Sequence, residues 1–78
     1  MGIKRPKTVR IYIPLLGEGT PVVRPTLGEI VSENAFRVLP TEDYDSEDEH
    51  WMFPPGTLVR CALEVWSLGK ILVAKEEC

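Results

Sequence analysis

The chain has 78 residues, of which 44% are hydrophobic and 27% charged, and its formal net charge is −3. This length allows one domain with a single small core, and the composition excludes disorder of the whole chain. Net acidity argues against general binding to nucleic acid, because phosphate contacts dominate that affinity. We expect one domain over 1–78, with a flexible basic N-terminus over 1–7 and a frayed C-terminus at 77–78.

The N-terminal third reads as two extended segments. Residues 8–16 alternate between apolar and other side chains, with β-branched residues in the apolar phase, which indicates a half-buried strand. Because Pro14 cannot donate to a ladder, this strand lies at an edge or leaves the sheet there. A turn rich in Gly and Pro follows. Residues 22–32 form the second segment, in which Pro25 and Gly28 suggest a bend or bulge.

Three more strands are expected in the rest of the chain. Residues 35–39 alternate and stop at Pro40, and residues 57–66 form a fourth strand. A tight turn at 67–70 leads into a final strand over 71–76. The expected apolar face of the fourth strand consists of Val59, Cys61, Leu63 and Val65.

Five short strands with frequent Gly and Pro turns predict an all-β fold. We expect a small five-stranded antiparallel SH3-like barrel, with at most a short helical turn near 46–53. An OB-like barrel is the alternative, since such barrels often carry a helix between strands three and four. Residues 41–56 occupy that position in this chain.

An acidic run precedes the fourth strand, and it resembles a calcium loop only in part. Its acidic residues are Glu42, Asp43, Asp45, Glu47, Asp48 and Glu49. Asp43, Asp45 and Glu47 have the i, i+2, i+4 spacing of an EF-hand loop. The glycine needed at the sixth position is replaced by Asp48, and the glutamate needed at the twelfth by Pro54. The spacing therefore argues against a calcium site, and no metal ligand is assigned.

The residues give little support to catalysis. His50 is the only histidine, and neither Ser46 nor Ser67 lies in the glycine-flanked elbow of a hydrolase nucleophile. Six acids in one polar loop are expected to be solvated, so no pair is set up for acid–base chemistry. No phosphate-binding loop is present in the sequence. We expect no enzymatic activity, no catalytic residue and no cofactor.

The same loop has a structural interpretation. Ser46 followed by Glu49 fits a capping box, which would begin a two-turn helix over 47–53. Trp51 and Phe53 would then close the open end of the barrel. In the alternative, both aromatic side chains are exposed as a partner-binding patch.

Four arginines fall one per strand in the first four expected strands, and they are Arg10, Arg24, Arg37 and Arg60. Each could simply be a solvated strand residue. The acidic loop could instead fold back and neutralise them, in exposed pairs worth about 0–1 kcal/mol each. In the functional interpretation they form one cationic patch for an acidic peptide or a phosphate-bearing ligand.

The two cysteines are too few for a disulfide scaffold, and Cys61 is expected to act as a small buried hydrophobic residue. No zinc or redox motif surrounds either Cys61 or Cys78. The start of the chain lacks the apolar segment of a signal peptide, and no apolar run approaches the roughly 18 residues of a membrane span. The expected location is the cytoplasm.

Several strings resemble a family of small, uncharacterised bacterial proteins. They are IYIPLLGEGTPVVRPT (11–26), LPTEDYDSEDEHWMFPPGTLVRC (39–61) and LGKILVA (68–74). That family combines an EGTxVxRP pattern with a DYDxEDExWxFPPG loop. The resemblance implies a small β-barrel in a bacterial, cytosolic context, with no established activity and no catalytic residue.

Together these features predict a non-enzymatic module that binds another protein, because aromatic residues and arginine are the usual anchors of such surfaces. The candidate partner-binding residues are Tyr12, Arg10, Arg37, Arg60, Tyr44, Trp51 and Trp66. One alternative is an acidic decoy or immunity-type inhibitor acting through residues 42–49. A weaker alternative is a nucleic-acid-associated module using the basic residues Lys4, Arg5, Lys7 and Arg10. No membrane partner is expected, and the sequence specifies neither the protein partner nor the oligomeric state.

Overall fold

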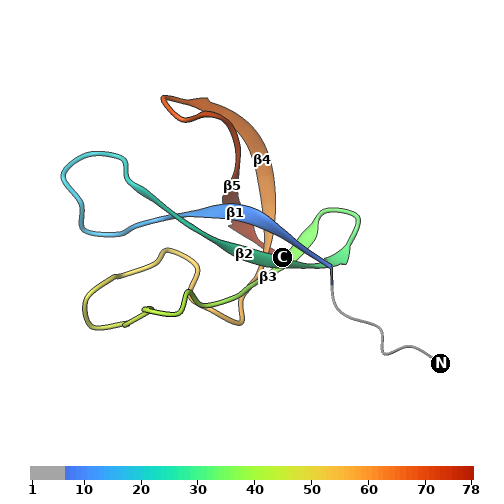
Figure 1. Cartoon of the computed structure of the whole chain (residues 1–78), viewed down its shortest axis with the longest axis horizontal. Coiled ribbons are helices and arrows are strands. Elements are labelled where there is room, and N and C mark those ends of the chain that lie inside the picture. Colours follow the sequence, from blue (N-terminus) through green and yellow to red (C-terminus); the bar gives the residue numbers. More distant parts are fainter. Residues whose placement is uncertain (1–6) are drawn as a thin grey trace.

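The computed structural model describes residues 7–78, and this part of the chain forms five strands and no helix. The strands are β1 (Thr8–Pro14), β2 (Val23–Ser32), β3 (Ala35–Val38), β4 (Leu58–Trp66) and β5 (Gly69–Glu77). The all-β prediction is confirmed, and the strand order agrees with the expected one (Figure 1). The OB-like alternative loses its main support, because the segment between β3 and β4 contains no helix.

The strands close into a small barrel in the order β1-β2-β3-β4-β5, consistent with the SH3-like expectation. Each strand pairs with the next in antiparallel fashion. Closure comes from a single parallel pair between Tyr12 of β1 and Val73 of β5. This pair must be parallel, because a chain that reverses at every turn runs in the same direction in its first and fifth strands.

The core is built from the apolar phases of the alternating strands. Ile11 and Ile13 of β1 face Phe36 and Val38 of β3, and all four are buried. Gly28 of β2 makes this close packing possible, since a Cβ there would lie 2.8 Å from Ile11 Cδ1. The bend or bulge expected at Gly28 is absent, because β2 continues through this residue. The register between β2 and β3 shifts instead between Ile30 and Ser32.

Residues 47–53 do not form the expected two-turn helix, and the single turn at 46–48 stays within the predicted limit of a short helical turn near 46–53. Asp45, and not Ser46, organises a single turn: its Oδ1 accepts the Glu47 N–H at 2.9 Å, and its carbonyl accepts the Glu49 N–H at 2.9 Å. Beyond this turn the chain is extended, because His50 O accepts the Leu16 N–H and Met52 N–H donates to Pro14 O. Pairing with the end of β1 thus replaces the helical hydrogen bonds.

The apolar face expected for the fourth strand is only partly correct. Val59 is buried and Cys61 half-buried, but Leu63 and Val65 of the same phase are exposed. The cause is that the β4–β5 hairpin extends beyond the barrel, as its upward course in Figure 1 shows. Only the base of β4 lies next to β3, where it pairs at two positions.

The described part of the chain begins at Lys7 and includes the C-terminus. The expected flexible segment 1–7 lies outside the described residues except for Lys7, whose carbonyl accepts the Ile30 N–H at 2.9 Å. At the C-terminus, β5 includes Glu77, and the Cys78 N–H donates to Leu58 O at 2.9 Å.

Candidate functional site

Trp51 is a core residue. Its side chain is 4% exposed, and its ring meets Tyr44 edge to face with centroids 4.7 Å apart. Its Nε1 donates to Glu49 Oε1 at 2.8 Å, and its backbone pairs with Leu15. Phe53 is also buried. Of the two interpretations of this loop, the barrel plug is the observed one, and Trp51 is not an exposed anchor.

Arg24 holds the acidic loop against the barrel. It lies opposite Ile13 in the inward phase of β2, at the end of the barrel near the loop. Its guanidinium bonds both carboxylate oxygens of Asp43, at 3.0 and 3.1 Å, and lies 3.4 Å from Glu49 Oε1. The nearby Thr41 hydroxyl, the backbone and the Arg24 guanidinium lower the pKa of Asp43, and of the two side chains only Arg24 makes a hydrogen bond to this carboxylate. The acidic loop therefore neutralises one of the four strand arginines.

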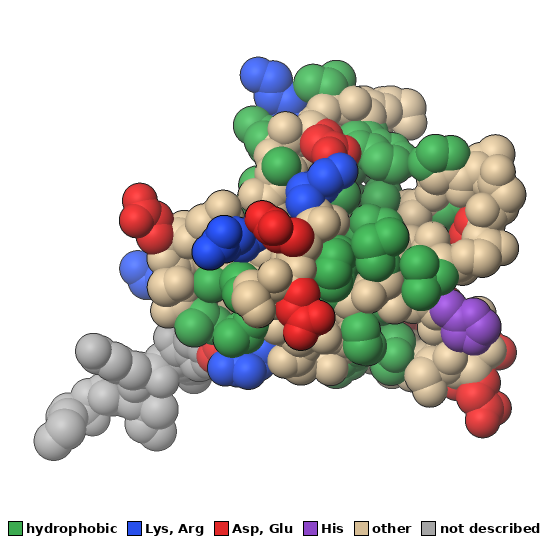
Figure 2. Space-filling view, turned by 180° about the vertical axis from the view of Figure 1, so that it is seen from behind, with side chains coloured by type: hydrophobic (Ala, Val, Ile, Leu, Met, Phe, Trp, Pro, Cys, Tyr) green, Lys and Arg blue, Asp and Glu red, His purple; other side chains and the backbone are tan. Residues whose placement is uncertain are grey.

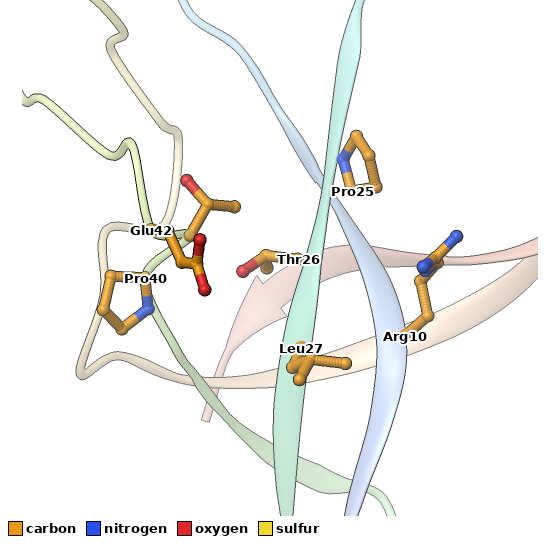
Figure 3. Close-up of a pocket in the computed structure, with 7 residues that line it drawn as sticks. Arg10, Pro25, Thr26, Leu27, Pro40 and Glu42 are labelled. Carbon is orange, nitrogen blue, oxygen red and sulfur yellow. The ribbon is translucent and has the colours of Figure 1, made fainter.

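The other strand arginines do not form an uncompensated cationic patch. Arg37 pairs with Glu29 of β2 at 3.2 Å, and Arg60 lies 3.9 Å from Glu76 of β5. Arg10 borders a hollow of about 350 Å³, which is also lined by residues 25–27 of β2 and by residues 40–42. In Figure 3 its side chain lies near Pro25, on the other side of β2 from Glu42. The grouping required for an anion site is therefore not observed.

A larger hollow, which we call the Trp66 groove, lies between the β1–β2 loop and the β4–β5 hairpin. Its volume is about 410 Å³, and its apolar walls include Pro14, Leu15, Pro21, Val22, Met52 and Trp66. In Figure 1 the loop and the hairpin extend away from the strand crossing on two sides of the space between them. Three segments distant in sequence thus meet at one surface.

Two charged side chains fix the position of the Trp66 indole. The Trp66 Nε1 donates to Glu64 Oε1 at 2.9 Å, while Lys75 Nζ lies 2.6 Å from the other carboxylate oxygen. The hydrogen bond from Lys75, and then that from Trp66, lower the pKa of Glu64, which therefore stays ionised at neutral pH. The result is a half-buried aromatic ring held in one orientation beside an apolar groove.

The predicted partner-binding residues lie at different places in the structure and do not form one surface. Trp66 lies in the groove, Tyr12 is half-buried at the closure of the barrel, and Tyr44 packs on Trp51. Sequence reasoning missed Met52, which is exposed and reaches the groove from the acidic loop. No periodic pattern marks it, because its position depends on the pairing of residues 50–52 with the end of β1.

The acidic turn presents a second surface. Asp45, Glu47 and Asp48 are exposed on the turn that Asp45 caps. Within residues 7–78, no three His, Cys, Asp or Glu side chains lie close enough together to hold a metal ion. The described strands and loops contain no helix long and apolar enough to cross a membrane.

Cys61 is the half-buried thiol of β4. Burial raises its pKa to about 11, with a smaller contribution from Cys78. Both cysteines are free. At neutral pH, Cys61 therefore behaves as a neutral, weakly reactive side chain.

Comparison of the chain with protein-family models, with curated proteins and with solved structures found no match. The resemblance to the small bacterial family therefore rests on the sequence motifs alone.

Proposed function

We propose that this chain is a non-enzymatic binding module, and that the Trp66 groove receives an apolar segment of a partner protein. The orientation of Trp66 carries the proposal. Its ring is fixed by Glu64 before any partner arrives, so little conformational entropy is lost on binding. Tryptophan and methionine are enriched at protein interfaces, and both line this groove.

The open shape of the groove suits a short cluster of apolar side chains from a partner protein. At about 410 Å³ it is open on one side, with prolines and valines on the walls. An extended peptide with two or three apolar side chains fits this shape. The Glu64–Lys75 pair at the rim offers one acceptor and one donor group for its backbone.

Capture from lysate of the source cells, with three immobilised proteins, tests this proposal. They are the natural chain, Trp66→Ala, and a control in which Asp45, Glu47 and Asp48 become amides. We expect a protein that the natural chain and the amide control retain and Trp66→Ala loses. Because apolar contacts dominate, retention should change little between low and high salt. Equal retention by Trp66→Ala would refute the groove as the binding site.

A second candidate function is the acidic decoy. The observation favouring it is that Asp45, Glu47 and Asp48 are exposed on an ordered turn, which can present a fixed array of negative charge. In the same experiment a decoy would lose its target in the amide variant, would keep it in Trp66→Ala, and would release it as salt rises.

A further inference from the structure

The outer half of β4 has an open edge. Although β4 spans Leu58–Trp66, it pairs with β3 only through Leu58 and Val59. Over residues 60–66, β4 pairs with none of the described strands on its β3 side. An edge of this kind is a template for pairing with another strand. A two-stranded ribbon without further cover is only marginally stable in water.

On one face of this part of β4, the alternating side chains are apolar and exposed. Leu63 is 63% exposed and Val65 77%, and Leu68 at the turn is 71% exposed. Figure 2 shows hydrophobic side chains at the upper end of the molecule, where the hairpin lies. Exposed apolar groups gathered in this way on a small domain mark an interaction surface.

The backbone groups at this edge have a defined direction. Thr57 O accepts the Val38 N–H on the β3 side, and Leu58 O accepts the Cys78 N–H on the β5 side. Along a β-strand, the N–H and C=O groups of successive residues point alternately to the two edges. The register shift near Arg60 leaves its extra residue in β5, so this alternation continues without interruption in β4. The N–H and C=O groups of Cys61, Leu63 and Val65 therefore point to the open edge.

We propose that a second copy of this chain pairs its β4 with this edge, antiparallel, about a two-fold axis at Leu63. Leu63 then faces Leu63 of the second copy, and Cys61 faces Val65 of the second copy. All three outward-pointing residues gain hydrogen-bonded partners, and the apolar phase becomes one continuous stripe. Such an isologous contact is closed, because each copy uses its only open β4 edge.

Charge complementarity selects this register and a second copy as the occupant. In this register, Arg60 of each copy lies opposite Trp66 of the other copy and diagonal to the Glu64 of that copy. The two-fold axis repeats this arrangement at both ends of the contact. Arg60 is free to turn, since its pair with Glu76 is exposed and 3.9 Å long. An axis at Glu64 would instead place two like charges face to face, which is destabilising. An axis at Ala62 would place the strand residue Val65 opposite Val59, where β3 already pairs, whereas the axis at Leu63 brings only the turn residue Ser67 to that position.

The oligomeric state tests the proposal directly. Sedimentation equilibrium of the natural chain should show a dimer, whereas Leu63→Lys should be a monomer. The lost burial of two leucines, together with two lysines facing each other at the axis, should raise the dissociation constant about a hundredfold or more. Leu27→Lys is the matched control, because Leu27 is 46% exposed on β2 and lies away from this edge. Circular dichroism shows that the variants are folded.

A monomeric natural chain up to millimolar concentration would overturn the proposal. So would a dimer that Leu63→Lys leaves intact, which would place the contact elsewhere. A chain held in a complex with a different protein through β4, and never with itself, would also overturn it.

Disulfide cross-linking tests the axis itself. In a Cys61→Ala and Cys78→Ser background, Leu63→Cys places one thiol on each side of the axis. Facing Cα atoms in an antiparallel pair are roughly 5.5 Å apart, within the range of a disulfide. Mild oxidation should convert Leu63→Cys to a covalent dimer and leave Leu27→Cys in the same background mainly monomeric. Equal rates for the two variants would contradict the proposed axis.

Discussion

Replacing Trp51 with alanine measures how much the acidic loop contributes to the core. The side chain is 4% exposed, packs on Tyr44 and donates to Glu49 at 2.8 Å. Removing a buried tryptophan side chain costs about 3–5 kcal/mol. A chain of this length has a free energy of unfolding of roughly 4–12 kcal/mol. We therefore expect Trp51→Ala to lose a large part of the free energy of unfolding and to populate unfolded chains at room temperature.

Urea unfolding followed by far-UV circular dichroism gives this loss directly. Two variants separate its sources. Trp51→Phe keeps an aromatic ring in the core but loses the bond to Glu49, a hydrogen bond to a charged acceptor worth about 1.5–3 kcal/mol. Trp66→Ala removes a tryptophan that is only half-buried, and should cost less than Trp51→Ala. If Trp51→Ala and Trp66→Ala cost the same, or if Trp51→Ala costs less than about 1 kcal/mol, Trp51 is not part of the core.

Three further predictions concern Gly28 in the core, the Arg24–Asp43 pair and the two thiols. Gly28→Ala should lower the free energy of unfolding by about 1–3 kcal/mol, measured in urea, because its Cβ would overlap Ile11; an unchanged value would contradict the close packing. The pKa of Asp43 lies below the ordinary 3.8, so its contribution to stability is present above that pH and lost as pH falls through the lowered folded value. Asp43→Asn should therefore flatten the fall in thermal midpoint on acidification, and an identical pH profile would refute this role. An alkylating reagent at pH 8 should modify exposed Cys78 well before Cys61, whose pKa is about 11; mass spectrometry that finds equal rates would contradict its burial.

The strands could be predicted because their signals are local. In β1 the period of two places Ile11 and Ile13 in the core, and the proline at position 14 ends the strand. The turn at 33–34 and the short β3 follow the same logic. These features depend on side-chain alternation and on the backbone limits of proline, both of which a sequence displays directly.

The acidic loop could not be predicted because its conformation depends on distant partners. Local signals favoured a helix after Ser46, but residues 50–52 bond to the end of β1 instead. Arg24, on β2, then pairs with Asp43 across 19 positions of the chain. No local pattern announces either contact, since each requires the barrel to be closed first.

The candidate site also combines a residue that the sequence predicts with one that it does not. Trp66 was identified from its residue type, but Met52 was not, because the groove exists only where the β1–β2 loop, the acidic loop and the hairpin meet. The exposure of Leu63 and Val65 was likewise hidden, since alternation in β4 predicts a buried face and cannot reveal where the barrel ends.

An all-β chain of five strands can be predicted without the structure, because alternation, prolines and turn residues act over a few positions. Which apolar side chains face water depends on the packing of the closed barrel. Trp51 and Leu63 show why: both belong to apolar stretches, yet one lies beneath the closed barrel and the other beyond its end. Burial depends on what lies across from a residue in space, and that is fixed only when the strands close.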